Sequence, residues 1–433
     1  GRVTAMDIDA VYDAGAYTTL SAVVLQRGVI CSSGVYTIEN LTVHGRAMKT
    51  NTVPNGAFRG FGAPQTFFAV EMMMTHVAED LGVEPLSFKE KHLAKQGDAT
   101  STGGRHHFGV PLPAMIEEVD HISGYREKHA AYSAPQTGRY RKGVGFSLWF
   151  HGAGFTGAGE RDLIKARAKL KKYRDGTIEA LTANTDMGQG LKTTFAKIIA
   201  KELGVAPESI IVDDPDTDRV PDSGPTVASR SLMIVGELLR RAAVRLKAEW
   251  KDGEEQTIEE RYVPPEFLIP FSLETFSGDA YPTYAWGAAA VELKVDTLTG
   301  LAEVLGVWSS FDVGTPIDEN IVVGQMEGGI LQSIGHAGME QMAADKSGRI
   351  RNNSLTDYII PTSMDVKNIQ VKLHVEEYPE GPYGAKGAGE LPAVGPAAAY
   401  AAAMGQALST KVNRAPFSAE DVMRVLREEK RHG

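Results

Sequence analysis

The chain has 433 residues, of which 42% are apolar and 23% are charged. At about 100–200 residues per domain, this length predicts two or three domains, each large enough to bury a core. The 45 Lys and Arg against 55 Asp and Glu give a net charge of −10, which argues against a nucleic-acid backbone as the partner. No run approaches the roughly 18 apolar residues of a membrane helix, so a soluble protein is expected.

Apolar and polar residues alternate over residues 1–60 in the pattern of strands, with Gly and Asn turns between them. Gly1 opens this alternation without a Met, a basic segment or an apolar segment, so we expect a fragment or a processed product and no signal peptide. Cys31 is the single cysteine and follows two apolar residues. It cannot form an internal disulfide or a Cys-rich metal site, and a core position is expected for it.

Helical spacing of apolar residues begins at Pro64 and continues to about Asp80, where Gly82 follows as a stop. A second helix is predicted from Pro85, because proline is favoured in the first turn. A short third helix is predicted near residues 113–121. The first part of the chain is therefore expected to combine strands with helices.

A polar stretch over residues 97–141 marks the predicted domain boundary, near residue 135. Residues 1–135 are expected to be the remainder of a first domain, and residues 136–433 a second domain. Strands are predicted in the second region over 143–150, 178–185, 288–296 and 302–311, and helices over 191–203, 229–250, 324–336 and 397–409. The two kinds of element mix without regular βαβ spacing, so the predicted fold class is α+β.

Glycine-rich turns with polar neighbours form the main chemical signal of the sequence. They are Ala57-Phe-Arg-Gly-Phe-Gly-Ala-Pro-Gln65, Asp186-Met-Gly-Gln-Gly190, Asp222–Ser231 and Gly384-Ala-Lys-Gly-Ala-Gly-Glu-Leu-Pro392. Glycine lets backbone N–H groups approach an anion, and a following helix N-terminus adds a favourable dipole. Several such turns in one chain suit a large phosphate-bearing cofactor, whereas each one alone is an ordinary turn. None is a P-loop or a dinucleotide fingerprint, which argues against a nicotinamide dehydrogenase.

Glu390 is the carboxylate that stands out, because it lies between Gly389 and Leu391 in a stretch with few other charges. One interpretation is a partly buried carboxylate with a raised pKa suited to a general base. The other, which the sequence alone favours, is a glutamate that stabilises a helix N-terminus. The adjacent His106 and His107 cannot share a helix face, so no metal bound directly by protein side chains is expected.

The ordered set of motifs resembles the xanthine dehydrogenase/aldehyde oxidase family of molybdenum hydroxylases, specifically the C-terminal part of the molybdopterin-binding subunit. The likeness is closest to xanthine dehydrogenase and covers nearly the whole chain. It rests on Ala57-Phe-Arg-Gly-Phe-Gly-Ala-Pro-Gln, Met187-Gly-Gln-Gly, Gly324-Gln-Met-Glu-Gly-Gly and Lys386-Gly-Ala-Gly-Glu. The resemblance implies two mixed α/β lobes with the cofactor between them.

The resemblance also implies catalytic roles for two residues. Glu390 resembles the family's general base, which deprotonates a molybdenum-bound hydroxide before its oxygen attacks an electron-poor carbon and hydride passes to a Mo sulfido centre. Arg59 resembles the arginine beside the metal, where a fixed guanidinium stabilises charge on the substrate. Its alternative is an ion pair that anchors the loop.

A molybdenum–molybdopterin cofactor follows from the same likeness, with the metal held through the pterin and not by side chains. The cytosine dinucleotide form is favoured because separate subunits are typical of bacteria. The residues expected to hold the cofactor are Gly188, Gln189, Gly190, Ala228, Ser229, Ser231, Gln325 and Gly389. Helix capping is the alternative role of the two serines.

The implied substrate is a purine, xanthine or hypoxanthine, hydroxylated with oxygen from water. Phe61 and Phe155 align with the family's two phenylalanines that sandwich the purine, and Thr156 follows the second. Arg27 falls where xanthine dehydrogenases have an arginine that binds the purine oxygen. An aldehyde or another N-heterocycle such as nicotinate is the alternative substrate, and a non-catalytic cofactor-holding subunit is the alternative function.

The family's molybdenum subunit has a further N-terminal part that the chain lacks, together with its substrate-binding glutamate and its glutamine near the metal. We therefore expect a separate chain or a lost segment to complete the active site. Iron–sulfur cysteines and a flavin domain are also missing from the sequence, so 2Fe-2S and FAD are expected on partner subunits that receive the electrons. The single cysteine and the family together favour a cytoplasmic location.

Overall fold

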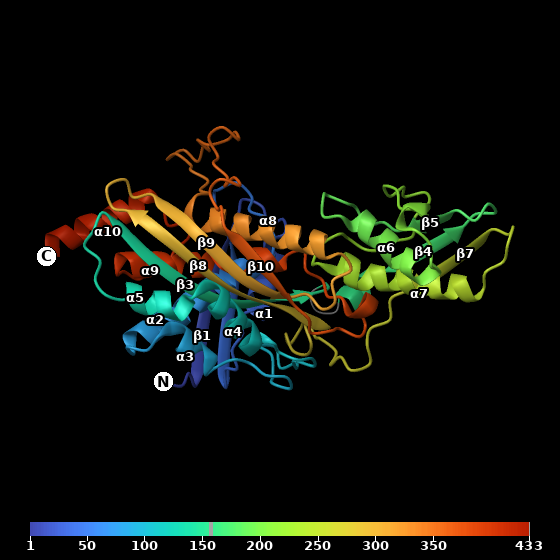
Figure 1. Ribbon diagram of the computed structural model, residues 1–433, viewed down its shortest axis with the longest axis horizontal. Coiled ribbons are helices and arrows are strands. Elements are labelled where there is room, and N and C mark those ends of the chain that lie inside the picture. Colours follow the sequence, from blue (N-terminus) through green and yellow to red (C-terminus); the bar gives the residue numbers. More distant parts are fainter. Residues whose placement is uncertain (156–158, 433) are drawn as a thin grey trace.

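The large sheet of the protein has four strands in the order β10 (Ile369–His374), β9 (Ala302–Asp312), β8 (Thr283–Asp296) and β3 (Tyr140–Ala153). β3, β8 and β9 are antiparallel neighbours, and β10 adds in parallel. The computed structural model describes residues 1–155 and 159–432. The long strands run through the body of the molecule towards a smaller lobe (Figure 1).

Helix α9 (Pro396–Leu408) lies on one face of this sheet, very close to β3. A Cβ atom on Gly143 would lie 1.9 Å from the carbonyl oxygen of Ala403, and one on Gly145 would lie 2.1 Å from that of Ala399. Only glycine therefore permits this approach on the strand. The Ala-rich helix predicted over residues 397–409 is confirmed.

The opposite face of the sheet is covered by α4 (Leu112–Ser123) and α5 (Tyr125–Tyr132). Ser310 of β9 donates a hydrogen bond to Glu118, and Lys128 lies 2.7 Å from the buried Glu292 of β8. Since both faces are packed, the central strands are buried along most of their length.

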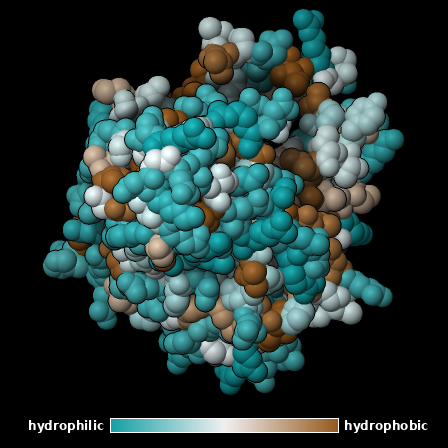
Figure 2. Space-filling model, turned by 90° about the vertical axis from the view of Figure 1, so that its right-hand side faces the viewer, coloured by the Kyte–Doolittle hydropathy of each residue, from teal (hydrophilic) through white to brown (hydrophobic). Residues whose placement is uncertain are grey.

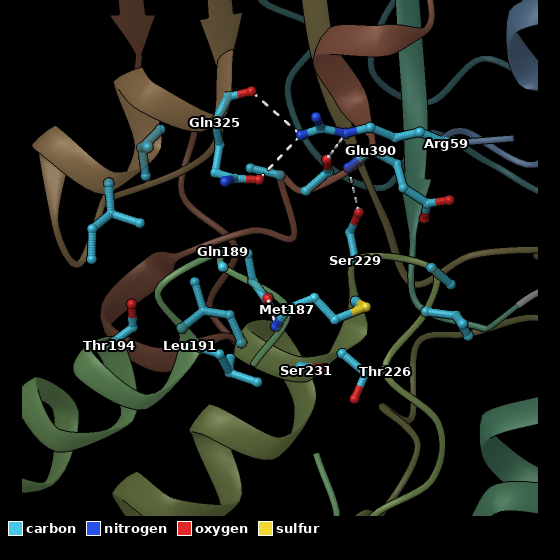
Figure 3. A pocket seen from close by; sticks show the side chains of 18 of the residues that line it. Arg59, Met187, Gln189, Leu191, Thr194, Thr226, Ser229, Ser231, Gln325 and Glu390 are labelled. Carbon is cyan, nitrogen blue, oxygen red and sulfur yellow. Dashed lines mark hydrogen bonds between the residues drawn. The ribbon is translucent and has the colours of Figure 1, made fainter. Parts of the chain in front are cut away.

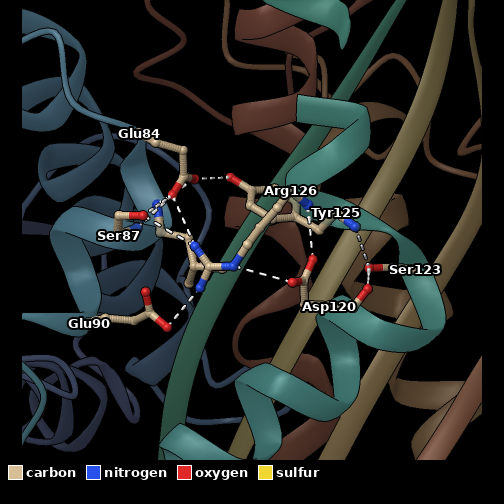
Figure 4. A network of polar contacts seen from close by, with 8 residues as sticks. Glu84, Ser87, Glu90, Asp120, Ser123, Tyr125 and Arg126 are labelled. Atoms are coloured by element: carbon tan, nitrogen blue, oxygen red, sulfur yellow. Dashed lines mark hydrogen bonds and ion pairs between the residues drawn. The ribbon is translucent and has the colours of Figure 1, made fainter. Parts of the chain in front are cut away.

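An arginine joins three of the helices on this side of the molecule (Figure 4). Arg126 of α5 lies 2.8 Å from Glu90 at the end of α3 (Pro85–Glu90) and 3.2 Å from Asp120 of α4. Tyr125 donates a hydrogen bond to Glu84, the N-cap of α3, at 3.0 Å. The segment just before residue 135 is thereby fixed to the preceding helices, including α2 (Ala63–Asp80) through its contacts with α3.

The N-terminal strands β1 (Ala5–Gly15) and β2 (Asn40–Lys49) form a separate two-stranded parallel sheet. The connection between them contains helix α1 (Ser21–Ile30), where the sequence predicted only strands and turns. Its β-branched residues suit a strand, but the parallel pairing of β1 with β2 requires a crossover, and a helix supplies it. Cys31 lies directly after α1 with 1% of its surface exposed, so its predicted core position is confirmed.

The smaller lobe is inserted between β3 and β8 and has its own sheet and hydrophobic core. Its strands and helices are β4 (Arg167–Lys172), β5 (Ile178–Leu181), α6 (Leu191–Leu203), β6 (Ile210–Ile211), α7 (Glu237–Ala248) and β7 (Gln256–Arg261). β7 was not predicted, because its residues lie in a stretch that reads as irregular and Pro-rich. α6 matches its predicted range at both ends.

Two long helices complete the larger lobe, α8 (Glu319–Gly338) and α10 (Ala419–His432). The short helical turns are Gly159–Ile164, Pro207–Ser209, Ser231–Gly236, Pro382–Gly384 and Leu391–Ala393. No helix within residues 1–155 and 159–432 is long and apolar enough to cross a membrane.

The predicted α+β class is confirmed, because the described residues combine helices with a two-stranded parallel sheet and two four-stranded sheets. The predicted boundary at residue 135 falls between α5 and β3. One hydrophobic core includes Phe67 and Tyr125 from before that point and Phe146 and Trp286 from after it. The division into 1–135 and 136–433 stays a prediction.

Candidate active site

A cavity of about 580 Å³ lies where the two lobes meet (Figure 3). The smaller lobe contributes the turn before α6 and the segment 226–232, and the larger lobe contributes α8 and the loops around Arg59 and Glu390. Much of the lining is apolar and includes Met187, Leu191 and Ile321. Figure 2 shows that the face of the smaller lobe is mostly hydrophilic and that apolar side chains gather along one side, where the surface is hollowed. Such a cavity suits a ligand with a sizeable apolar part.

Arg59 lies in the cavity wall with its guanidinium held by acceptors from other segments. Its Nε donates to the carbonyl oxygen of Gly389 at 2.6 Å, and its Nη1 donates to Gln332 Oε1 at 3.0 Å. Nη2 donates to Gln325 Oε1 at 3.1 Å. Burial lowers the pKa of Arg59 from its ordinary value, while the nearby Glu390 raises it. The side chain is thus a fixed cation that joins the Arg59 loop, α8 and the Glu390 segment.

Glu390 lines the same cavity, with 12% of its side chain exposed. Its Oε1 accepts a hydrogen bond from the Gly60 amide at 3.1 Å, and its own amide donates to Ser229 Oγ at 3.0 Å. Its Oε2 lies 3.9 Å from Arg27 Nη1 and 3.2 Å from His151 Nε2, but makes no hydrogen bond among the described residues. One carboxylate oxygen is therefore buried beside two nitrogen atoms without a hydrogen bond in that part of the chain.

The prediction of a raised pKa for Glu390 is wrong. Burial alone raises the pKa of this carboxyl, but His151, the Arg27 guanidinium and the Gly60 amide lower it, and the resulting pKa is about 2. The sequence shows the sparse charge next to Glu390 but not the cation that comes from residue 27. At neutral pH the side chain is a carboxylate, the form that accepts a proton.

The turn before α6 forms the wall on the side of the smaller lobe. Asp186 accepts hydrogen bonds from the amides of Gly188 at 2.9 Å and Lys192 at 3.1 Å, and Gln189 donates to the Thr185 carbonyl at 2.9 Å. Gly188 has a φ of +104°, which side chains other than glycine rarely adopt. The turn is therefore closed by its own hydrogen bonds, and Gly188 and Gln189 line the cavity.

The segment before α7 forms a second part of this wall. Ala228 and Ser229 have φ values of +57° and +53°, an uncommon conformation for residues with side chains. Ser231 Oγ accepts a hydrogen bond from Asn184 Nδ2 at 3.2 Å, and Asn184 Oδ1 is buried without a partner among the described residues. Backbone strain and an unpaired buried acceptor together are typical of a ligand site.

The structure brings most of the candidate residues to the cavity. Those that line it are Arg59, Phe61, Gly188, Gln189, Ala228, Ser229, Ser231, Gln325, Gly389 and Glu390. Gly190 lies beside them, since a Cβ on it would lie 3.0 Å from the Ile321 side chain. Their grouping from five distant segments agrees with a common site, while the individual roles stay predictions.

Only some of the candidate substrate residues line the cavity. Phe61 lines the cavity, whereas Arg27 and Phe155 do not. Arg27 has 2% of its surface exposed, donates to the Gly152 carbonyl and lies over the Tyr281 ring at 5.0 Å. Thr156 lies outside the described residues.

Sequence reasoning missed His151, Asn184 and Gln332. His151 has no exposed surface and lies at the end of β3, where its alternating neighbours indicate only a strand. Asn184 follows a predicted strand, and Gln332 lies about two turns after Gln325 on α8. The position of His151 and Asn184 at the carboxyl end of a strand is a signal that could have identified them as candidate site residues. The sequence around Gln332 gives no such signal. Within residues 1–155 and 159–432, no group of three His, Cys, Asp or Glu side chains is placed to hold a metal ion.

Comparisons with known proteins agree with this geometry. One model of a molybdopterin cofactor-binding domain matches residues 1–93, and a second matches residues 118–262 and 253–367. The chain is 31% identical over 445 residues to the aldehyde oxidoreductase of Megalodesulfovibrio gigas, a match that covers 99% of this chain and 48% of that protein. It is 29% identical to a probable xanthine dehydrogenase subunit of Bacillus subtilis, over 98% of this chain and 60% of that protein.

Solved structures give the same result. The aldehyde oxidoreductase of Desulfovibrio desulfuricans superposes with a TM-score of 0.86 at 26% identity, over 98% of this chain and 47% of that one. A copper–molybdenum carbon monoxide dehydrogenase shares the fold, with a TM-score of 0.86 at 21% identity, over 99% of this chain and 60% of the other. The chain thus spans about half to three fifths of the length of these proteins. It belongs to the xanthine dehydrogenase/aldehyde oxidase family of molybdenum hydroxylases and corresponds to part of their molybdopterin-binding region.

Proposed function

We propose that this chain carries the catalytic residues of a molybdenum hydroxylase that acts on a purine, xanthine or hypoxanthine. The observation that carries the proposal is the pairing of Arg59 and Glu390 in one cavity wall, with Arg59 Nε on the carbonyl of Gly389, next to the base. A fixed cation beside an ionised carboxylate can stabilise negative charge on a substrate while a proton is removed.

The residues present fit a molybdenum–molybdopterin group. Glu390 Oε2 and Asn184 Oδ1 are acceptors without partners in or beside the cavity, among the residues that the structure describes, and Ser229 and Ser231 supply hydroxyl groups. Gln325, Gln189 and Gly188 line the same space. When bound, the group supplies the two-electron redox chemistry of the hydroxylation.

The chain's own residues then have distinct tasks. Glu390 accepts a proton on its carboxylate, whose Oε1 is held by the Gly60 amide and whose Oε2 lies 3.2 Å from His151 Nε2. Arg59 stabilises negative charge and keeps Glu390 in place through the carbonyl of Gly389. The apolar side chains of Met187, Leu191 and Ile321 line the same cavity and can contact an apolar part of a ligand.

The purine is favoured by Phe61 in the cavity wall and by the buried cation Arg27 beside Glu390. An aldehyde or another N-heterocycle is the second candidate, since the curated relatives include an aldehyde oxidoreductase as well as a probable xanthine dehydrogenase subunit. A non-catalytic cofactor-holding subunit is the third. We assign Phe155 and Thr156 to the substrate side of the site on the family resemblance alone.

We propose the other parts of the holoenzyme on the family resemblance, and the relatives extend well beyond this chain. Further polypeptide, as a separate chain or a segment, completes the active site. Iron–sulfur and FAD subunits accept the electrons, the pterin carries a cytosine dinucleotide, and the assembly is cytoplasmic.

The test is anaerobic dye reduction by the native complex, with xanthine, an aldehyde and nicotinate supplied in turn. We expect urate from xanthine, and loss of turnover by about 10²- to 10⁴-fold in Glu390→Gln. Arg27→Ala should lower purine turnover by a larger factor than aldehyde turnover, because the effect of Arg27 on Glu390 is common to both substrates. If a molybdenum-loaded complex oxidises aldehydes but does not turn over xanthine, the proposal of a purine substrate is rejected. If Glu390→Gln keeps full turnover, the proposed catalytic role of this chain is rejected.

A further inference from the structure

Strand β3 lies along the segment that follows Glu390 and holds it at regular intervals. Side chains on one face of a strand recur every second residue. On this face, Ser147 donates to the Gly395 carbonyl at 3.0 Å, and Trp149 Nε1 donates to the Leu391 carbonyl at 2.8 Å. His151 is the next residue of the series, and its Nε2 lies 3.2 Å from Glu390 Oε2. The strand register therefore aims His151 at the carboxylate itself.

The His151 ring is fully buried, yet neither of its nitrogens makes a hydrogen bond among the described residues. Glu390 Oε2 is equally without one in that part of the chain, although the two atoms lie within hydrogen-bonding distance. Buried polar atoms left in this way carry a desolvation cost unless a small rotation pairs them. The carboxylate can only accept, so it selects the imidazole tautomer with the proton on Nε2.

We propose that His151 is a positioning residue for Glu390, whose Nε2–H holds Oε2 so that the carboxylate stays ionised and fixed beside the cavity. The inference rests on the proposed function, because it assigns to His151 an effect on the base of that reaction. It concerns a residue that belongs to none of the glycine-rich turns.

The charges around the ring support a neutral donor. Burial lowers the pKa of His151, the cations Arg27 and Arg59 lower it further, and Glu390 opposes them. The charged groups that act on the His151 ring are Arg27, Arg59 and Glu390. Tyr281 lies against Arg27, which is over its ring. Because the imidazole is neutral at neutral pH, it acts on Glu390 through its N–H bond, in addition to the charge of Arg27 at 3.9 Å.

The test replaces His151 in the complete enzyme complex. His151→Phe removes the N–H and keeps the ring, whereas His151→Gln places an amide N–H near the former Nε2 position. We expect kcat to fall about tenfold in His151→Phe with KM unchanged, because the carboxylate is no longer held in position, and we expect the acid limb of the pH profile to move to higher pH. His151→Gln should restore both. His106→Phe is the matched control, because this buried histidine packs on Tyr284 and Trp286 and does not contact Glu390.

A second measurement does not depend on turnover. The infrared carboxyl band that is missing in Glu390→Gln reports the protonation of this side chain during an acid titration. Its midpoint should rise in His151→Phe and return towards the parent value in His151→Gln. Should the Phe variant fail to fold, His151→Asn, which is too short to reach Oε2, is titrated in its place.

The two proposals fail in different ways. An unchanged infrared midpoint and acid limb in a folded His151→Phe or His151→Asn protein would overturn the role of His151. Turnover that survives Glu390→Gln would overturn the proposed function, and the infrared titration would still decide whether His151 holds the carboxylate.

Discussion

Single side chains from distant parts of the chain determine the protonation state of the site. Glu390 is surrounded by the Gly60 amide, the Arg27 guanidinium and the His151 ring. Two of these residues precede it by more than 300 positions. The pKa of about 2 follows from this assembly and not from the neighbours of Glu390 in the sequence.

Arg59 gives the first prediction at this scale. Its planar guanidinium reaches Gly389, Gln325 and Gln332 together, which a single ammonium group cannot do. In Arg59→Lys we expect kcat to fall about a hundredfold although the charge is kept. Turnover per bound molybdenum is the measurement, and Arg240→Lys, which alters a pair with Glu237 on α7, is the control. A loss of only a few fold would contradict the assigned role.

His106 gives a prediction about stability and pH. Burial lowers the pKa of His106 to about 4 in the folded protein, compared with about 6.5 in an unfolded chain. The unfolded state therefore binds more protons between these values, and the free energy of unfolding falls as the pH falls from about 6.5 to about 4, by roughly 3 kcal/mol at most. His106→Phe should remove this part of the pH dependence.

Urea-induced unfolding of the parent and of His106→Phe at a series of pH values measures the difference. Replacement of the exposed His44 by Gln is the control and should leave the slope unchanged. An equal loss of stability on acidification in the parent and the Phe variant would show that His106 is not responsible.

At the scale of elements, the segment that carries Glu390 is anchored to the end of β9. Lys386 Nζ lies 2.6 Å from Asp312 Oδ2, and neither side chain is exposed. Asp312 Oδ1 also accepts from the Gly314 amide at 3.0 Å. The buried pair thus fixes the start of the Lys386-Gly-Ala-Gly-Glu motif to the large sheet, four residues before Glu390.

Breaking this pair should destabilise the fold. Lys386→Met leaves the Asp312 carboxylate buried without its cation, at a cost of about 3–5 kcal/mol in the free energy of unfolding. The double variant Asp312→Asn with Lys386→Met should recover much of that loss, because no buried charge remains. Chemical unfolding of the single and double variants forms a double-mutant cycle, in which additive losses would argue against coupling between the two side chains.

Sequence patterns predict elements well where periodicity agrees with packing. α6 has the predicted bounds, α9 matches the predicted Ala-rich helix, and the candidate cavity residues follow from motifs that belong to a known family. α1 was missed because Val23, Val24 and Val29 favour a strand, and the crossover that makes it a helix depends on the distant β2. His151 and the low pKa of Glu390 were missed for the same reason, since both depend on contacts between segments far apart in the chain.

At the scale of the whole molecule, the cavity is shared between the two lobes. α6 of the smaller lobe is joined to α8 by Lys197 and the N-cap Asp318, and Tyr383 donates to Glu202 of α6 at 2.8 Å. A ligand that contacts both walls therefore stabilises the arrangement of the lobes as well as its own site.

Cofactor loading should consequently protect both walls from hydrogen exchange. We expect slower amide exchange in residues 186–190, 226–231 and 325–332 of the loaded protein than of protein produced in a host that cannot make molybdopterin. α10, remote from the cavity residues in sequence and absent from its lining, is the internal control. Protection confined to one lobe would contradict a shared site.

The insertion of the smaller lobe between β3 and β8 has a consequence for folding kinetics. The register pairs Ala153 with Thr283, so the central hairpin of the large sheet closes across the whole insertion. Closing a disordered loop of that length costs entropy before any strand contact is gained, whereas a folded insertion brings its two ends together. Folding of the smaller lobe therefore speeds the pairing of β3 with β8. Substitutions in the core between β4 and α7 will slow refolding of the large sheet, although the substituted residues do not contact it.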